Sequence, residues 1–133
     1  MRNYQTDLIY KDLSFKIVGL LYDIHNELGR YCNEKQYGDK LEELLKTNNI
    51  KYQREFILPS SFSSEMKGRN KVDFIVDDKI ILEFKNKRRL ERLDYYQLQR
   101  YLKAADKKLG ILVNFHQQNL MPKRIINSSK INY

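Results

Sequence analysis

The chain has 133 residues and a formal net charge of +8, with 25 Lys and Arg against 17 Asp and Glu. This length predicts one domain over residues 1–133, with a core of about residues 7–122 and a C-terminal tail at 123–133. The single cysteine, Cys32, excludes an internal disulfide and a four-cysteine zinc or iron–sulfur site. The longest apolar runs fall far short of the roughly 18 to 20 residues that span a bilayer, so we expect a soluble, cytoplasmic protein.

Positive charge is concentrated between Lys85 and Lys108, where nine basic residues stand against three acidic ones. A basic stretch of this kind raises the local concentration of polyanions. We therefore expect nucleic acid as the partner, DNA more than RNA. The alternative is a solvated helix face whose charge serves only solubility. The residues expected to contact nucleic acid are Lys87, Arg88, Arg89, Arg92 and Arg100.

Two helical segments are expected at the start of the chain. Apolar residues recur every three or four positions between Asp7 and Leu28, which predicts a long first helix. Gly29 interrupts this pattern, and the same spacing resumes from Tyr37 to Leu45. The sequence therefore predicts a kinked or two-part helical unit.

Three strands are expected next. The alternation over Ile50–Leu58 predicts a strand that Pro59 ends. Two β-branched runs, Val72–Val76 and Ile80–Lys85, are separated by the short turn Asp77–Lys79. This is the pattern of a β-hairpin.

A helix and a fourth strand complete the predicted fold. Asp94 is a suitable cap for a helix with apolar residues from Leu98 to Leu109, and Gly110 is expected to end it before a strand over Ile111–Phe115. The strand–helix–strand passage favours a parallel pairing with a right-handed crossover. The predicted fold class is α/β, with a mixed four-stranded sheet flanked by helices.

Two carboxylates are predicted to face each other across the hairpin. If the turn is centred on Asp78, then Val76 pairs with Ile80 and Asp73 pairs with Glu83. Side chains at such a pair have Cβ atoms about 4.5 to 5.5 Å apart, and like charges there are destabilising unless a positive group lies between them. Mg²⁺ and Mn²⁺ prefer oxygen ligands and are typically held by one or two carboxylates. The sequence thus indicates Asp73 and Glu83 as metal ligands.

Lys85 is predicted to extend from the same face as Glu83, because side chains alternate along a strand. An ammonium group there can orient a metal-bound water or stabilise charge on a phosphate oxygen. The alternative is that Glu83 and Lys85 are edge-strand charges that prevent aggregation, with Asp73 a chance charge. The apolar residues that alternate with them instead predict a strand buried on both faces, where charges need a reason.

The order of these residues resembles the PD-(D/E)xK nuclease superfamily, with its restriction-endonuclease-like αβββαβ core, and more narrowly the GxxExxY protein family. The resemblance covers about residues 15 to 125. The matching segments are His25–Gly29, Glu34–Tyr37, Asp73–Val76, Glu83–Lys85, Gln97 ahead of Tyr101, and Leu109–Phe115. Together they form an ordered set that is more specific than the D…ExK triplet alone.

The resemblance implies a metal-dependent nuclease in which Asp73 and Glu83 bind Mg²⁺ or Mn²⁺ and Lys85 assists the attacking water. It further implies that Glu34 and Gln97 reach the same site from the flanking helices, and that His25 joins the metal shell. The alternatives are a solvated helix turn for Glu34, an exposed helix residue for Gln97 and a packed histidine for His25.

The chain departs from the family pattern in the turn before Glu34. Arg30–Asn33 stands where the family carries a glycine-rich turn, so the glycine of the family's name falls on Tyr31. Val72 replaces the superfamily's proline before Asp73. These departures leave a second hypothesis open, a catalytically inactive nucleic-acid-binding module or subunit of the same fold, and a third, a protein–protein interaction domain. Related small nucleases form pairs, so a homodimer is a further expectation.

Overall fold

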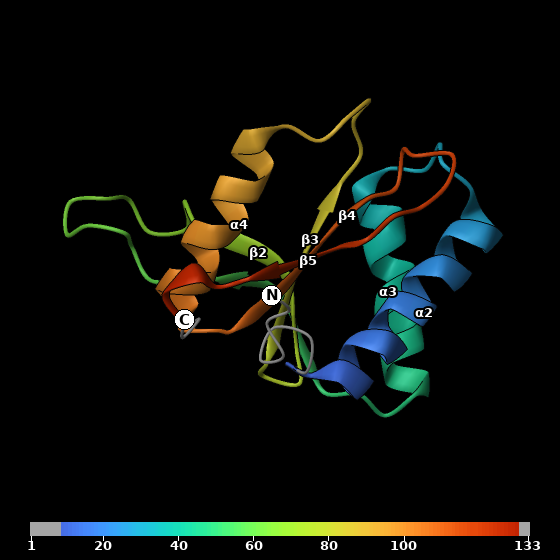
Figure 1. Ribbon diagram of the computed structural model, residues 1–133, viewed down its shortest axis with the longest axis horizontal. Coiled ribbons are helices and arrows are strands. Elements are labelled where there is room, and N and C mark those ends of the chain that lie inside the picture. Colours follow the sequence, from blue (N-terminus) through green and yellow to red (C-terminus); the bar gives the residue numbers. More distant parts are fainter. Residues whose placement is uncertain (1–8, 131–133) are drawn as a thin grey trace, which may run out of the picture.

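The computed structural model describes residues 9–130 as a five-stranded sheet with α2 and α3 on one face and α4 on the other (Figure 1). The strands lie in the order β1-β2-β3-β4-β5. The helices are α2 (Lys11–Leu28), α3 (Glu34–Thr47) and α4 (Arg92–Ala105). The strands are β1 (Tyr52–Ile57), β2 (Lys71–Val76), β3 (Ile80–Lys85), β4 (Leu109–Asn114) and β5 (Lys123–Ile126), followed by a 3-10 turn at Ser128–Lys130. Within this part of the chain no helix is long and apolar enough to cross a membrane.

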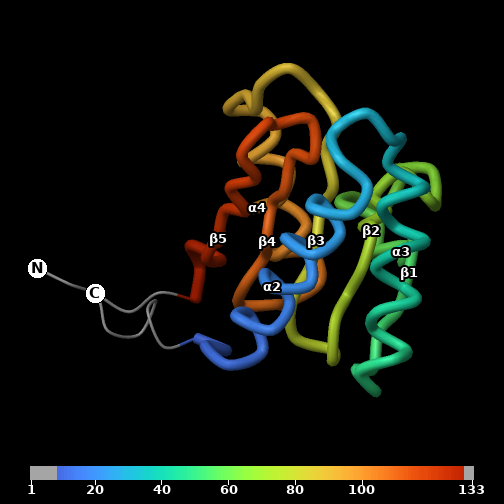
Figure 2. Tube along the Cα trace, turned by 90° about the vertical axis from the view of Figure 1, so that its right-hand side faces the viewer, coloured from blue at the N-terminus to red at the C-terminus, as the bar shows by residue number. Residues whose placement is uncertain are grey.

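The fifth strand corrects the expected count of four. β5 pairs antiparallel with β4, from Leu109 opposite Ile126 to Leu112 opposite Lys123 (Figure 2). Its four residues have no apolar alternation and are only partly buried, so the sequence carries no strand signal there. The pairing comes instead from β4, whose open edge accepts this short strand because main-chain groups beside a buried strand need partners.

The two-part helical unit is confirmed. The buried side chains of α2 include Ile17, Leu21 and Ile24, which follow the predicted spacing along one face. Gly29 ends the helix with a positive φ of 75°, a conformation that glycine adopts without strain. The predicted start of this helix at Asp7 lies outside the described residues.

The predicted hairpin is also confirmed. β2 pairs antiparallel with β3, with Val76 opposite Ile80 and Phe74 opposite Leu82. Asp77 and Asp78 turn the chain with φ values of 51° and 55°, a left-handed conformation that aspartate tolerates better than most residues. The three-residue turn therefore sets the register that aligns the two strands.

The parallel pairing of β3 with β4 is as predicted, and α4 forms the connection. The expected end of this helix at Leu109 is wrong, because α4 ends at Ala105, with Asp106 in a left-handed conformation at φ 55°. Gly110 lies within β4, where Leu98 of α4 comes within 2.9 Å of the position that a Cβ would occupy. The glycine is therefore needed for close helix–sheet packing rather than for ending the helix.

Candidate active site

The pairing between β2 and β3 changes character at Asp73 and Glu83. The regular main-chain ladder ends at Phe74 and Leu82. Beyond it, the Asp73 N–H donates to Glu83 Oε1 at 3.0 Å, and the Phe84 N–H donates to Asp73 Oδ2 at 2.7 Å. Side-chain carboxylates thus accept the bonds that carbonyls accept in a regular sheet. The structure brings these two predicted residues together at a point where the strands separate.

β1 is irregular at the same level. Arg54 pairs with Phe74 and Phe56 pairs with Val72, but Glu55 has no partner in the ladder. Glu55 adopts φ 51°, a left-handed conformation that is costly for a glutamate and that persists only where the surroundings impose it. Asp73 therefore lies between two strands that both depart from regular pairing beside it.

The carboxyl groups at this point resist ionisation. Burial raises the pKa of Glu83 to about 8, and the charge of Asp73 adds to the effect. Burial also raises the pKa of Asp73, against the Phe84 N–H bond and the charge of Lys85. Glu83 is 6% exposed. The positive groups around Asp73 and Glu83 therefore do not compensate for the charge of the two ionised carboxylates.

The donor set fits a hard divalent cation. Each carboxylate uses one oxygen for a main-chain N–H, and among residues 9–130 no hydrogen bond involves Asp73 Oδ1 or Glu83 Oε2. In the same range Asn86 Oδ1 is the one side-chain polar atom that is both buried and unpartnered, so these two oxygens keep contact with solvent. Two such oxygens with several waters are a typical Mg²⁺ environment. No three side chains of His, Cys, Asp or Glu in the described chain converge on one point.

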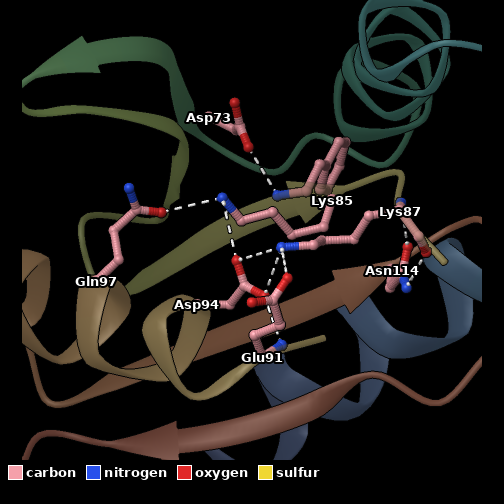
Figure 3. Close-up of polar contacts among 8 residues, drawn as sticks. Asp73, Lys85, Lys87, Glu91, Asp94, Gln97 and Asn114 are labelled. Atoms are coloured by element: carbon pink, nitrogen blue, oxygen red, sulfur yellow. Dashed lines mark hydrogen bonds and ion pairs between the residues drawn. The ribbon is translucent and has the colours of Figure 1, made fainter. Parts of the chain in front are cut away.

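Lys85 reaches α4 from the end of β3. Its Nζ donates to Gln97 Oε1 at 3.0 Å and lies 3.9 Å from Asp94 Oδ1 (Figure 3). Because Gln97 is neutral, it orients the ammonium group without cancelling its charge. The structure thus places Gln97 at the site, as a neighbour of the lysine.

Asp94 is held from several sides at the start of α4. Its Oδ2 accepts the Glu91 N–H at 2.7 Å, and Lys87 Nζ lies 3.1 Å from the same oxygen (Figure 3). Burial opposes the ionisation of Asp94, but these two partners outweigh it and lower its pKa. Asn114, fully buried at the end of β4, bonds both the N–H and the C=O of Lys87. This network fixes the segment that follows Lys85.

Glu34 lies at the start of α3 and lines a cavity of about 240 Å³ with Glu55 and Asp73. Burial raises the pKa of Glu34, and the charge of Asp73 raises it further. A capping box between Asn33 and Gln36 fixes this helix start. The structure therefore places Glu34 on the same cavity as Asp73, one member of the carboxylate pair.

His25 has a different partner. Its Nε2 lies 2.8 Å from the carbonyl oxygen of Gln117, in the segment after β4. The bond connects α2 to this segment, and no contact of the described chain joins the ring to Asp73 or Glu83. A metal-binding role for His25 stays a prediction.

The predicted nucleic-acid contacts follow β3. Arg88, Arg89, Arg92 and Arg100 are exposed, whereas Lys87 forms ion pairs with Glu91 and Asp94. The guanidinium of Arg100 lies 5.6 Å from the ring centre of Tyr101. The four arginines thus remain accessible from solvent beside the Lys85–Gln97 pair.

Sequence reasoning missed the roles of Glu55 and Asp94 at this site. Asp94 was expected as the cap of this helix, but Glu91 is the N-cap and Asp94 lies in the first turn. Its approach to Lys85 depends on where the crossover places α4. Glu55 is an acidic residue within a predicted strand. The sequence does not determine which residue pairs with it, because the connection from Leu58 to Asn70 is too long to fix the register between this strand and the one that carries Asp73.

The chain matches a nuclease family model in sequence and is similar to a solved structure in fold. A family model described as the PD-(D/E)XK nuclease superfamily matches residues 11–126. Among solved structures, "Crystal structure of SSO0001" is similar with a TM-score of 0.53 and 22% identity over 92% of this chain. The chain spans 60% of the length of that structure, and a likeness at this identity concerns the fold alone. Among curated proteins, none matches this chain.

Proposed function

The chain belongs to the PD-(D/E)XK nuclease superfamily, and from that premise we propose that it is a divalent-metal-dependent nuclease that hydrolyses phosphodiester bonds of DNA, or of RNA. The observation that carries the proposal is the pairing of Asp73 with Glu83 where the β2–β3 ladder ends, with the charge of Lys85, two residues further along β3, acting on both carboxyl groups. Each carboxylate there presents one oxygen that no main-chain group of residues 9–130 uses.

Asp73 and Glu83 are the proposed ligands of Mg²⁺ or Mn²⁺, and Glu34 lines the same cavity as Asp73. A divalent cation supplies Lewis-acid stabilisation of charge on the phosphate. The raised pKa values of all three carboxyl groups support the proposal, since a cation provides the positive charge that their surroundings lack.

Lys85 is the proposed partner of the attacking water and of the reacting phosphate. In hydrolysis the water oxygen bonds to phosphorus, the P–O ester bond breaks, and the leaving oxygen takes up a proton. The ammonium of Lys85, held by Gln97, can orient the water or stabilise the charge that grows on a phosphate oxygen. Gln97 thus acts through Lys85, as a positioning residue.

We also propose that the chain is a GxxExxY-type member of the superfamily. Glu34 and Tyr37 stand at the spacing of the ExxY motif, and both contribute to the site region. Tyr37 is fully buried, stacks on Phe115 at 4.1 Å between ring centres, and donates its hydroxyl to the Gly29 carbonyl at 2.6 Å. The tyrosine therefore anchors the turn that leads into Glu34.

The nucleic acid is proposed to lie along the exposed arginines that follow β3. Arg88, Arg89 and Arg92 lie in the segment that enters α4, and Arg100 lies on α4 itself. Guanidinium groups suit phosphate contacts because they present several donors at once.

The test is cleavage of labelled single-stranded DNA, duplex DNA, branched DNA and RNA by the purified chain with Mg²⁺ or Mn²⁺. Parallel reactions contain a chelator, or the variants Glu83→Ala and Lys85→Ala. Cleavage should occur with metal, vanish in chelator and with Glu83→Ala, and fall by about 10²- to 10³-fold with Lys85→Ala. Binding without cleavage, unchanged by chelator or variant, would instead favour an inactive nucleic-acid-binding module. Absence of both binding and cleavage would contradict the proposal.

A further inference from the structure

Tyr31 is an exposed aromatic residue in the connection between α2 and α3. The residue is 82% exposed. A single exposed tyrosine is ordinary on a protein surface. Tyr31 differs from such residues in the contacts that hold its surroundings in place and in its position three residues before Glu34, which lines the same cavity as Asp73.

Two neighbours brace the ring. The guanidinium carbon of Arg30 lies over it, 5.3 Å from the ring centre, and His116 meets it nearly edge-on at 80° and 6.2 Å. Arg30 is itself held, because its Nε donates to the His116 carbonyl at 2.8 Å. A ring supported in this way, and still mostly exposed, offers an open surface at little cost in conformational freedom.

The backbone around Tyr31 is tied to the catalytic strand. Asn86, which directly follows Lys85, donates its side-chain amide to the Cys32 carbonyl at 2.9 Å. The Cys32 N–H donates to the Tyr37 hydroxyl at 3.2 Å. The connection between α2 and α3 is therefore held by two hydrogen bonds, one from Asn86 after β3 and one to Tyr37 of α3.

The connection between α2 and α3 also lies at the same end of the molecule as the segment that follows Lys85. Tyr31 precedes Glu34 by three positions, and Glu34 lines the same cavity as Asp73. The α2–α3 connection and the segment from β3 to α4 lie at one end of the molecule, at the top of Figure 2. A strand bound at the carboxylates and continuing toward this end of the molecule thus approaches the connection that carries Tyr31 (Figure 2).

Resting on the proposed nuclease function, we propose that Tyr31, braced by Arg30 and His116, is a stacking platform for an unpaired nucleobase next to the cleavage site. The preferred substrate class is then single-stranded nucleic acid, or nucleic acid with unpaired bases at the cut. Every base has a π-face that stacks on an aromatic ring, whereas the bases inside a perfect duplex already stack on each other. Arg30 adds a positive charge beside the ring for the adjoining phosphate.

The experiment measures binding of labelled oligonucleotides to the full-length chain by fluorescence anisotropy, in chelator so that no strand is cut. The probes are a single strand of mixed sequence and a blunt duplex of the same sequence, each at two salt concentrations. The variants are Tyr31→Ala, Tyr31→Phe and, as a matched control, Tyr22→Ala, which removes another exposed tyrosine ring from α2.

Tyr31→Ala should weaken single-strand binding roughly 5- to 150-fold, since base–aromatic stacking is worth about 1–3 kcal/mol per base. Duplex binding should change much less. Tyr31→Phe and Tyr22→Ala should bind like the natural chain, because each keeps the stacking ring at position 31. The salt dependence of Tyr31→Ala should stay the same, because no phosphate contact is lost.

Three results would overturn the inference: unchanged single-strand binding by Tyr31→Ala, an equal loss for duplex and single strand, or a Tyr31→Phe variant as weak as Tyr31→Ala. In these cases the natural chain still binds nucleic acid and the proposed function stands. A natural chain that neither binds any probe in chelator nor cleaves with Mg²⁺ overturns both.

Discussion

The two faces of the sheet differ in what they bury. The face under α2 and α3 is apolar, with Phe74, Leu82 and Phe84 packed against helix residues. The face under α4 carries Glu83 and Lys85 beside an apolar cluster around Ile81. Because side chains alternate along a strand, one six-residue strand supplies both faces.

This difference shows how a strand can hold a costly charge. Glu83 and Asp73 oppose folding when ionised, because burial removes water from both. The apolar face offsets that cost through residues that alternate with them. Substitutions on the first face should therefore affect stability, and substitutions on the second should affect catalysis.

The largest effect is expected for Phe84→Ala on the apolar face. Phe84 is 2% exposed and packs against Phe74 and Phe115. Its loss should lower the free energy of unfolding by about 3–5 kcal/mol. Phe15→Ala, at a ring that is 67% exposed on α2, should change it by less than about 0.5 kcal/mol. Chemical denaturation measures both, and equal effects would contradict the assignment of this face as core.

Lys85→Ala should lower kcat by about 10²- to 10³-fold, the usual cost of removing one group that stabilises the transition state. Lys87→Ala is the matched control, since both lysines pair with Asp94 but Lys87 also pairs with Glu91 and does not contact Gln97 in the described chain. It should raise KM with little change in kcat. Steady-state cleavage assays separate the two, and a similar loss of kcat in both variants would argue against a special role for Lys85.

The stability of the metal-free chain should depend on pH through Glu83. Its folded pKa of about 8 lies above the ordinary value of 4.5, so its contribution to stability is full below pH 4.5 and is lost as the pH rises toward 8. The slope is at most about 1.4 kcal/mol per pH unit. Glu83→Gln should remove this slope in denaturation curves between pH 5 and 8. An identical pH dependence of stability in the variant and the natural chain would show that Glu83 is not its cause.

A smaller effect is expected for Gln97→Ala, which removes the oxygen that orients Lys85. We expect a loss of about tenfold in kcat, because the ammonium stays but is less well placed. Gln99→Ala, on the same helix, breaks a bond to the Ile126 carbonyl instead and should leave kcat unchanged. A larger loss of kcat in Gln99→Ala than in Gln97→Ala would contradict a role for Gln97 at the site.

The sequence was sufficient for the hairpin and its register. The three-residue turn centred on Asp78 leaves one pairing that buries the apolar residues, and that pairing places Asp73 against Glu83. Periodicity likewise predicted α2, α3 and the parallel β3–β4 pair. In each case a local pattern and a short connection determine the result.

The remainder depends on contacts between distant segments. β5 exists because β4 has an edge to pair, and its own four residues show no strand pattern. Glu55 lies beside Asp73 through a register that a long loop cannot fix, and its left-handed φ has no signature in the sequence. Gly110 was interpreted as a helix end, but its role is to admit Leu98 against the sheet. Such features follow from tertiary packing.

The central claim is that Asp73 and Glu83 hold a divalent cation, and calorimetric titration of the chain with Mn²⁺ at pH 7.5 tests it most directly. The natural chain should bind the ion with release of protons, because Glu83 must ionise to act as a ligand. Asp73→Asn and Glu83→Gln should each lose that binding, while Glu34→Gln and His25→Gln test the two other predicted ligands. Equal Mn²⁺ affinity in the natural chain and in both carboxylate variants would contradict the account.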